Sequence, residues 1–580
     1  MLPTWVSTVL GDMNARAGSF EGQPMLLHHT GARTGAERVN PLAKFPSSCS
    51  TRRRNLLPGG HRGPHPDNSG SSPKGVRMDV TEPVVRTAAG QVRGRAGNGV
   101  AVFRGIPFAQ PPVGALRFAA PQPARPWDGV READMFGPPP PQSAFMLGPT
   151  APVAPGADPD DWLTVNVFSP ELGGAGLPVM VWIYGGGYRF GVSSQVVYDG
   201  TALARQNVVV VTFNHRVGVE GYAYLPGVPA NRALLDQVAA LRWVQENIAA
   251  FGGNPDLVTV FGESSGAGAI ASLLVMPLAA GLFRRAIAQS VPGTFFSPEL
   301  AADVTAAIAA EAGLPPTTEA FAAADPAWLT AASDAVNPAD HQDRWGPAGR
   351  TGVSFSPVVD GEVLPAAPWR ALAAGAGRGV SLVAGYNRDE YRLFTALNGQ
   401  RGKITEEVAS DMLRGLAGGN MQSRAGEAAY REAYPDADAE MLFELVNSDW
   451  LFRMPTLHLA QAHAAAGGKT FLFQVSFEAT EGGFGACHGI VLPLVFGVYS
   501  GLGEFLFGPE PPASAVALGD LMRSQWAAFA ASGDPGWPQY TPGSRLTRIF
   551  DDPPGVVPYP EKASLHIWDQ HRFGVLDLRP

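Results

Sequence analysis

A serine at position 264 stands at the centre of a Gly-x-Ser-x-Gly pattern at residues 262–266. Val258, Val260 and Phe261 come before it, and small apolar residues follow it, so the stretch predicts a buried strand, a tight turn and a helix. Such a turn strains the backbone of the serine and exposes its hydroxyl, and only small residues fit two positions before and after it, where strand and helix nearly collide. Ser264 is therefore the candidate nucleophile.

A serine hydroxyl needs a base, and the sequence offers eleven histidines. A nucleophile in this kind of turn is associated with the chain order serine, carboxylate, histidine. His488 lies in a loop of small residues, 485–489, shortly after a predicted strand at 469–477. Catalytic groups of open α/β sheets lie at strand ends of this kind, so His488 is the candidate base. The alternative is a surface histidine without a role.

The acidic partner of the histidine is expected at the end of a strand between Ser264 and His488. Glu390 and Asp389 both follow a predicted strand at 379–386. Either carboxylate could orient an imidazole. An exposed acidic turn is the alternative interpretation of both residues.

Three glycines at 185–187 follow a strongly apolar strand. Without side chains, their backbone can approach a reacting carbonyl oxygen closely. The N–H groups of Gly186, Gly187 and Ser265 are the candidate oxyanion-hole donors, and Ser265 also opens the helix whose positive end favours an anion. A phosphate-binding loop is the competing interpretation, but the Lys-Ser/Thr pair and the Gly-x-Gly-x-x-Gly spacing are missing.

The elements that position these residues alternate between strand and helix. This order predicts a mostly parallel sheet covered on both faces. Strands are expected at 162–168, 177–184, 208–213, 258–261, 379–386 and 469–477, helices at 232–251, 301–334, 406–447 and 518–532, a hairpin at 84–95 and a loop at 103–118.

Composition excludes several classes of protein. The chain has 580 residues, 45% of them hydrophobic, and a net charge of −9, which fits a globular protein without a nucleic-acid partner. No run is long and apolar enough for a membrane span, and no secretory signal is visible. With only Cys49 and Cys487 present, no disulfide framework is expected. We expect a cytoplasmic protein without a metal or cofactor.

The N-terminal residues 1–77 differ from the rest. Residues 55–77 have the composition of a disordered linker. Residues 18–45 resemble a fragment of the deazaflavin-dependent nitroreductase family, too short to bury a core of its own. We expect residues 1–77 to be a poorly ordered extension and residues 78–580 to be the catalytic domain.

Five blocks of residues, in order, resemble the type-B carboxylesterase family, which includes cholinesterases and bacterial carboxylesterases. They are FRGIPFAQPPVGALRF at 103–118, VMVWIYGGGY at 179–188, the segment ending in GESSGAG at 232–268, AGYNRDE at 384–390 and GACHG at 485–489. The resemblance implies an α/β-hydrolase fold with helical insertions around an active-site gorge, and hydrolysis of small-molecule esters without a cofactor. It also implies a triad of Ser264, Glu390 and His488, choosing Glu390 over Asp389.

The chain departs from the family's pattern in places. Pro140 and Trp162 stand where many members have a disulfide, and Val491 stands where a glutamate is usual. The loop at 141–160 holds no tryptophan, so the choline site of cholinesterases is not expected. The resemblance also implies two ion pairs, Arg117 with Asp160 and Arg216 with Asp236.

Two other classes of function remain. Some members of this family are adhesion or binding proteins that have lost the serine, and residues 18–45 raise the possibility of an oxidoreductase. The filled triad positions favour the esterase. The motifs do not specify the ester, because the loops expected to form the substrate pockets (141–155, 297–350 and 394–447) carry no clear pattern. They do not specify the oligomeric state either.

Overall fold

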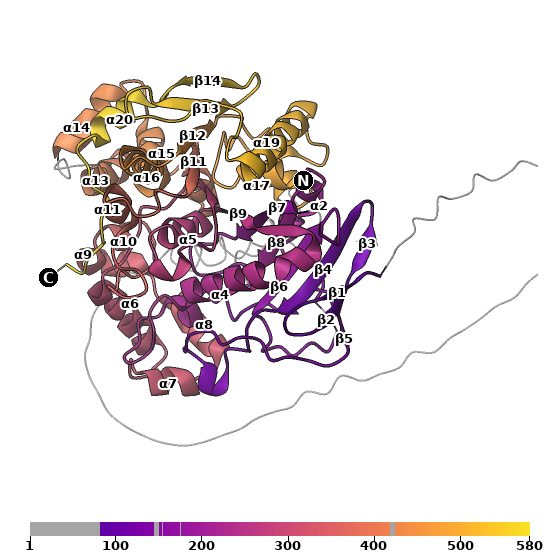
Figure 1. Ribbon diagram of the computed structural model, residues 1–580. Coiled ribbons are helices and arrows are strands. Elements are labelled where there is room, and N and C mark those ends of the chain that lie inside the picture. The colour runs from indigo at the N-terminus through magenta and orange to yellow at the C-terminus, as the bar shows by residue number, and fades with distance from the viewer. Residues whose placement is uncertain (1–81, 144–149, 154, 175, 418–423, 580) are drawn as a thin grey trace, which may run out of the picture. The chain divides into compact units, whose positions relative to one another are not determined.

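The computed structural model describes residues 82–143, 150–153, 155–174, 176–417 and 424–579 (Figure 1). The predicted extension at 1–77, with its nitroreductase-like segment, lies outside the described residues. The predicted boundary at residue 78 therefore stays a prediction.

A mixed sheet runs through the described part of the chain. The central strands of this sheet run parallel to one another, and the pairs toward both edges are antiparallel. The sheet confirms the predicted α/β-hydrolase fold. In spatial order the strands are β14 (Gly555–Pro558), β13 (Leu546–Phe550), β12 (Thr470–Val475), β11 (Ser381–Asn387), β10 (Arg285–Gln289), β9 (Gly253–Glu263), β7 (Leu177–Ile183), β8 (Val209–Phe213), β6 (Thr164–Ser169), β4 (Val100–Pro107) and β3 (Arg95–Gly97).

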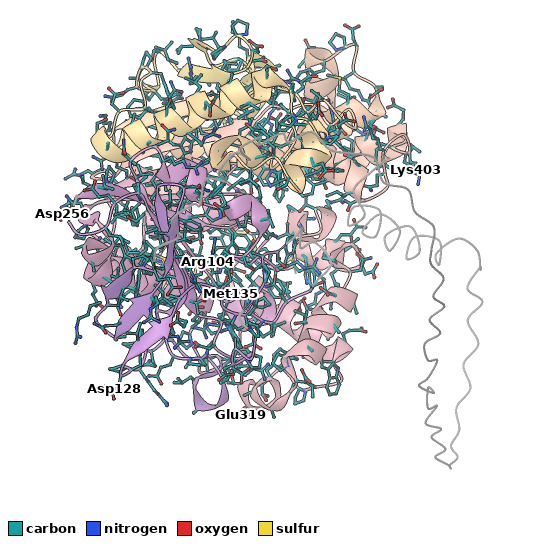
Figure 2. All side chains as sticks on the ribbon, turned by 90° about the vertical axis from the view of Figure 1, so that its right-hand side faces the viewer. Arg104, Asp128, Met135, Asp256, Glu319 and Lys403 are labelled. Carbon is teal, nitrogen blue, oxygen red and sulfur yellow. The ribbon has the colours of Figure 1, made fainter. Side chains whose placement is uncertain are left out.

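Strand β7 shows how the sheet is buried on both faces. Val179, Val181 and Ile183 belong to the core on the side of α4 (Arg232–Asn247) and α5 (Ser265–Leu273). The alternate residues Met180 and Trp182 belong to the core on the side of α17 (Val491–Phe496) and α19 (Ala513–Ser532). A strand with both faces covered has a continuous apolar sequence, as this one does. The charged side chains of Asp128, Asp256, Glu319 and Lys403 point outward in Figure 2.

The predicted hairpin at 84–95 is confirmed, but the loop predicted at 103–118 is partly wrong. The hairpin strands β1 (Val84–Arg86) and β2 (Gln91–Arg93) pair with each other and with β5 (Val130–Glu132). Residues 103–107 belong to β4, which pairs with β6 across a bulge. Gly105 lies in this bulge with φ +67°, and its N–H donates to Asn166 Oδ1 at 3.0 Å. The glycine and prolines of this stretch are the reason that the sequence analysis predicted a loop here and not a strand.

Helical insertions follow the central strands, as the sequence predicts. The range 301–334 contains three helices that begin at side-chain caps from Ser297, Thr317 and Asp325. The insertion helices are α6 (Pro298–Glu311), α7 (Thr318–Ala323), α8 (Pro326–Ala335), α13 (Glu406–Leu416), α14 (Arg424–Ala433) and α15 (Ala439–Ser448).

One of the two expected ion pairs is confirmed and the other is wrong. Arg216 and Asp236 form a fully buried pair with a nitrogen–oxygen distance of 2.7 Å. Arg117 pairs instead with Glu220, at 2.6 Å, because α3 (Gly218–Tyr222) brings that carboxylate against the buried guanidinium. Asp160 lies exposed. No helix in the described ranges is long and apolar enough to cross a membrane.

Candidate active site

Ser264 lies in the turn between β9 and α5, as predicted. Its backbone angles are φ 58° and ψ −129°, a conformation that costs a residue other than glycine about 1–3 kcal/mol. Two hydrogen bonds hold it there: Ser264 N–H donates to the Gln289 carbonyl at 2.9 Å, and Gly268 N–H donates to the Ser264 carbonyl at 3.0 Å. The surrounding structure therefore imposes the strain on this serine.

The two glycines of the motif are required by the neighbouring strand. A Cβ on Gly262 would lie 2.7 Å from the carbonyl oxygen of Ile183, and a Cβ on Gly266 would lie 2.1 Å from the same oxygen. Both distances are far shorter than a normal contact. The motif thus allows β7, β9 and α5 to meet directly below Ser264.

Glu390 lies just after β11 and is fully buried. Its Oε1 accepts hydrogen bonds from Asn387 N–H at 2.7 Å and from the Ser290 hydroxyl at 2.6 Å. Its Oε2 lies 2.6 Å from Nδ1 of His488. The two hydrogen bonds to Oε1 therefore fix the carboxylate so that Oε2 faces the imidazole.

Asp389, the rival carboxylate, faces other groups. It pairs with Arg388 at 2.8 Å, and its Oδ2 accepts from the Ala486 N–H at 2.9 Å. Although burial acts to raise the pKa of Asp389, the hydrogen bond and charge of Arg388 lower it below its usual range. Asp389 thus stabilises the loop that carries His488 through its backbone, whereas Glu390 contacts the imidazole.

His488 lies in the loop before α17 and is buried. Phe452 stacks against its ring with centroids 4.3 Å apart, and the Phe394 ring lies 5.1 Å away. The neighbouring Cys487 is also buried, which raises the pKa of its thiol and suppresses the reactive thiolate.

Other histidines lie in different surroundings. His215 stacks on Tyr184 at 4.2 Å, and Nδ1 of His463 lies 2.7 Å from the Thr470 hydroxyl. The ring of His571 lies 4.9 Å from that of Trp568. Among the described histidines, His488 has both the carboxylate partner and the strand-end loop that the sequence predicts.

Glu263 is a site residue that the sequence analysis missed. Its Oε1 lies 3.1 Å from Nε2 of His488, within ion-pair distance, although this oxygen accepts no hydrogen bond from the described residues. Burial raises the pKa of Glu263 to about 7. The available signal was a glutamate directly before the nucleophile, at the end of a strand that is otherwise apolar.

The two glutamates act together on the base. Burial acts to lower the pKa of His488, but the negative charges of Glu263 and Glu390 outweigh it and raise the pKa above its usual range. The imidazole is thus flanked by a carboxylate at each ring nitrogen. This arrangement favours a proton on the ring.

Two of the three predicted oxyanion donors, Gly186 and Gly187, lie in the loop after β7, and the third, Ser265, begins α5. Gly186 and Gly187 have φ +125° and +59°, and a Cβ on Gly185 would lie 2.9 Å from Cβ of Ser264. Within the described part of the chain, the N–H groups of Gly186, Gly187 and Ser265 donate to no other protein group. These donors beside the serine are free to bind a developing negative charge.

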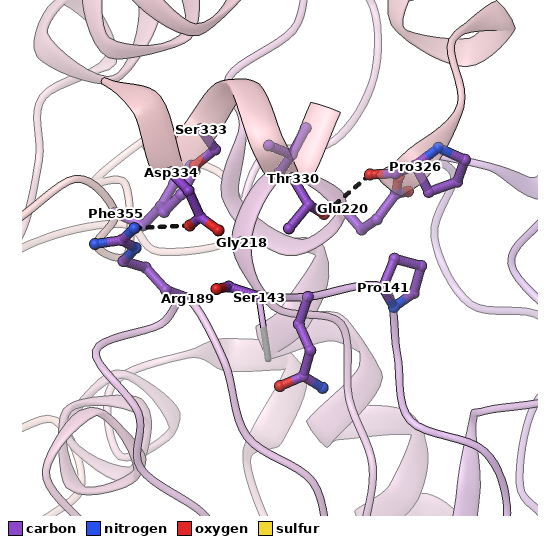
Figure 3. Close-up of a pocket in the computed structure, with 12 residues that line it drawn as sticks. Pro141, Ser143, Arg189, Gly218, Glu220, Pro326, Thr330, Ser333, Asp334 and Phe355 are labelled. Carbon is purple, nitrogen blue, oxygen red and sulfur yellow. Dashed lines mark hydrogen bonds and ion pairs between the residues drawn. The ribbon is translucent and has the colours of Figure 1, made fainter. Parts of the chain in front are cut away.

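Two cavities lie in the described part of the chain, and neither is lined by the triad residues or by the three glycines. The smaller has a volume of about 10 Å³, room for about one water molecule, and is lined by Arg189, whose ion pair with Asp334 at 2.9 Å is drawn in Figure 3. Arg189 N–H donates to the Gly186 carbonyl, which links this cavity to the oxyanion loop. The larger cavity, about 700 Å³, shares Pro141 and Glu220 with the smaller and is rich in proline.

Residue 491, where a glutamate is usual in the type-B family, is a core position here. Val491 is 1% exposed and lies in the apolar core beneath α17.

No described cluster of histidine, cysteine and acidic side chains could hold a metal ion.

Known proteins resemble this chain over most of its length. The sequence model of the carboxylesterase family matches residues 81–555. The para-nitrobenzyl esterase of Bacillus subtilis is 36% identical over 81% of this chain and 95% of its own length, and the fumonisin B1 esterase of Sphingopyxis macrogoltabida is 34% identical over 81% and 86%.

Solved structures agree with these sequence relatives. A PNB esterase superposes with a TM-score of 0.74 at 34% identity, covering 84% of this chain and 99% of its own. A carboxylesterase of Geobacillus stearothermophilus superposes with a TM-score of 0.73 at 35% identity, again covering 84% and 99%. The chain therefore belongs to the carboxylesterase family.

Proposed function

We propose that the protein hydrolyses carboxylic esters through an acyl-enzyme intermediate on Ser264, with His488 as general base and acid and Glu390 as the group that orients it. The observation that carries the proposal is the 2.6 Å contact between Nδ1 of His488 and the buried Glu390. This contact supports a neutral imidazole with its proton on Nδ1 and with Nε2 as the basic nitrogen.

The first half of the reaction acylates the serine. The Ser264 oxygen bonds to the ester carbonyl carbon while its proton passes to Nε2 of His488. The carbonyl electron pair moves onto oxygen, which the N–H groups of Gly186, Gly187 and Ser265 stabilise. The carbon–oxygen bond to the alcohol then breaks, and the imidazolium donates its proton to the leaving oxygen.

The second half releases the acid. A water molecule gives its proton to Nε2 and attacks the acyl carbon, and the same N–H groups stabilise the second tetrahedral intermediate. Collapse of this intermediate breaks the bond to Ser264 and returns the proton to the serine oxygen. Throughout, Glu390 balances the positive charge that forms on the imidazole.

The substrate is proposed to be a small-molecule ester. The cavity of about 700 Å³ lined by prolines and Trp162 contains none of the candidate catalytic residues, so the proposal does not rest on it. Relatives are named for para-nitrobenzyl and fumonisin B1 esters. A series of p-nitrophenyl esters of increasing acyl length would map the preference.

Labelling with a fluorophosphonate probe tests the proposal. The probe reacts with an activated serine, so we expect one label per chain, found by mass spectrometry on the peptide that contains Ser264, with loss of esterase activity in proportion to labelling. No labelling under conditions in which the protein hydrolyses esters would contradict a serine nucleophile. No labelling and no hydrolysis would favour a binding protein that keeps the fold.

A further inference from the structure

A wide helical turn joins two helices beside the candidate site. Residues Asp449–Arg453 form one π-helical turn between α15 and α16 (Met454–Ala465), in which Met454 N–H donates to the Asp449 carbonyl five residues earlier. Such turns are rare, insert an extra residue into a helix and are frequent at functional sites. The turn changes the direction in which its side chains leave the helix.

Pro455 and Gly293 explain part of this geometry. Proline has no N–H, so Pro455 cannot donate to the Leu451 carbonyl four residues earlier. That carbonyl accepts instead from Gly293 N–H at 2.8 Å. A Cβ on Gly293 would lie 2.8 Å from the Pro455 ring and 2.9 Å from the Trp450 carbonyl oxygen. Only glycine lets the loop after β10 approach the turn this closely.

Phe452 is the residue that the turn directs at the catalytic base. Its side chain is 3% exposed, and its ring stacks on His488 at 4.3 Å with an angle of 26° between the ring planes. Phe394, from α12 (Arg392–Leu397), also contacts His488 and stacks on Phe452 at 6.0 Å. The imidazole therefore packs against a pair of phenyl rings.

A buried polar network anchors the turn. Arg453 and Asp449 pair at 2.7 Å and are almost completely buried. Asp449 accepts from the Tyr430 hydroxyl at 2.7 Å, and Arg453 donates to Ser564 of α20 (Lys562–Trp568) at 2.8 Å.

The same network reaches the segment that carries the acid. Arg453 also donates to the Arg388 carbonyl at 3.1 Å, two residues before Glu390. Asp449 and Arg453 thus fix the turn relative to Glu390 as well as to α20.

We propose that Phe452 is a positioning residue for the general base: the π turn holds its ring against His488 so that the imidazole keeps Nδ1 on Glu390 and Nε2 available to Ser264. The inference rests on the proposed function. The last side-chain torsion of histidine is broad, and the single contact to Glu390 does not fix the plane of the ring. Glu263, 3.1 Å from Nε2, competes for the same nitrogen. The stacked Phe452 ring limits both the rotation of the imidazole about this torsion and its movement toward Glu263.

The test compares Phe452 with a matched phenylalanine. Phe452→Leu and Phe452→Met remove the aromatic face, and Phe452→Tyr keeps it. Phe251→Leu is the control, because Phe251 is also buried and packs at 5.0 Å on Phe103. Phe251 ends a short helix before the start of β9, whereas Ser264 follows the end of that strand. Concentrations of active sites come from fluorophosphonate titration, so unfolded protein does not enter kcat.

We expect Phe452→Leu and Phe452→Met to lower kcat about tenfold or more with KM changed by less than about threefold, because ground-state binding is retained. Phe452→Tyr and Phe251→Leu are expected to stay within about threefold of wild-type kcat. Equal losses for Phe452→Met and Phe251→Leu, or a change in KM alone, would overturn the inference.

A double-mutant cycle separates this inference from the proposed function. If Phe452 acts through the imidazole, adding Phe452→Leu to His488→Ala lowers kcat by no more than about twofold beyond His488→Ala alone. Additive losses would show a general structural role and overturn the inference. Near wild-type activity of His488→Ala itself would instead overturn the proposed triad.

Discussion

The imidazole of His488 has a carboxylate at each nitrogen, and they come from the ends of different strands. Glu390 follows β11 and faces Nδ1 at 2.6 Å, and Glu263 ends β9 and faces Nε2 at 3.1 Å. In the proposed reaction Glu390 stabilises the imidazolium that forms, whereas Glu263 faces the nitrogen that is proposed to accept the proton of Ser264. The pH dependence of the esterase depends on both.

Activity is expected to rise with pH through a midpoint above the ordinary histidine value of about 6.5. His488 must be neutral to accept a proton, and the carboxylates raise its pKa despite burial, so deprotonation needs a higher pH. Glu263→Gln removes the negative charge that Glu263 gains as pH rises through its pKa of about 7, and therefore moves the midpoint to lower pH. The measurement is kcat/KM from about pH 5 to 9. A midpoint that stays in place or moves upward in Glu263→Gln would contradict this electrostatic account.

Glu390→Gln and Asp389→Asn form a matched pair of neutral replacements. Glu390 contacts the imidazole, so its loss is expected to lower kcat by about a hundredfold or more, as the loss of a triad carboxylate does. Asp389 contacts Arg388 and the Ala486 N–H, so Asp389→Asn is expected to lower Tm and to lower kcat less than Glu390→Gln does. The reverse order in kcat would identify Asp389 as the catalytic carboxylate.

At the scale of the elements, strand ends bring the site together. Ser264, Glu390 and His488 follow β9, β11 and β12, whose carboxyl ends share one edge of the parallel sheet. These three candidates were selected from the sequence because a turn motif and strand-end loops mark them, and the family resemblance chose Glu390 over Asp389.

Other features carry no local mark. The partner of Arg117 is Glu220, 103 residues away, and only the placement of α3 decides it. Phe452 reaches His488 through a π turn, and a sequence pattern does not distinguish such a turn from the helices around it. The second half of β4, residues 103–107, was predicted as loop because it contains the glycine of its bulge.

Helix α17 gives a prediction at this scale. Val491→Glu would put a carboxylate at a position that is 1% exposed, and burying a charge without a partner costs several kcal/mol. We expect a Tm lower by several degrees at about pH 8, with a smaller loss at about pH 5, where the carboxyl can be protonated. Val556→Glu, at an exposed position on the edge strand β14, is the control. An unchanged Tm for Val491→Glu would mean that a partner for the carboxylate exists.

At the scale of the whole molecule, the described fold accounts for every proposed catalytic group. The first residue of β1 is Val84, and the earliest proposed site residue is Gly186. Residues 55–77 have too little apolar side chain to offset the entropy of ordering them. The catalytic domain is therefore expected not to need residues 1–77.

Removal of residues 1–77 tests this division of the chain. A protein that starts at Met78 is expected to keep kcat/KM within about twofold of the full chain and Tm within about two degrees. A loss of about tenfold in kcat/KM would show that the N-terminal segment is part of the enzyme.

The measurement that tests the central claim most directly is the esterase activity of Ser264→Ala beside that of Ser265→Ala. Ser264 is proposed to supply the attacking oxygen, so its loss is expected to lower kcat by about four to six orders of magnitude with the fold retained. Ser265 is proposed to contribute only its backbone N–H, which alanine keeps, so Ser265→Ala is expected to stay within about tenfold of wild type. Retention of more than about one per cent of wild-type kcat by purified Ser264→Ala would contradict the account.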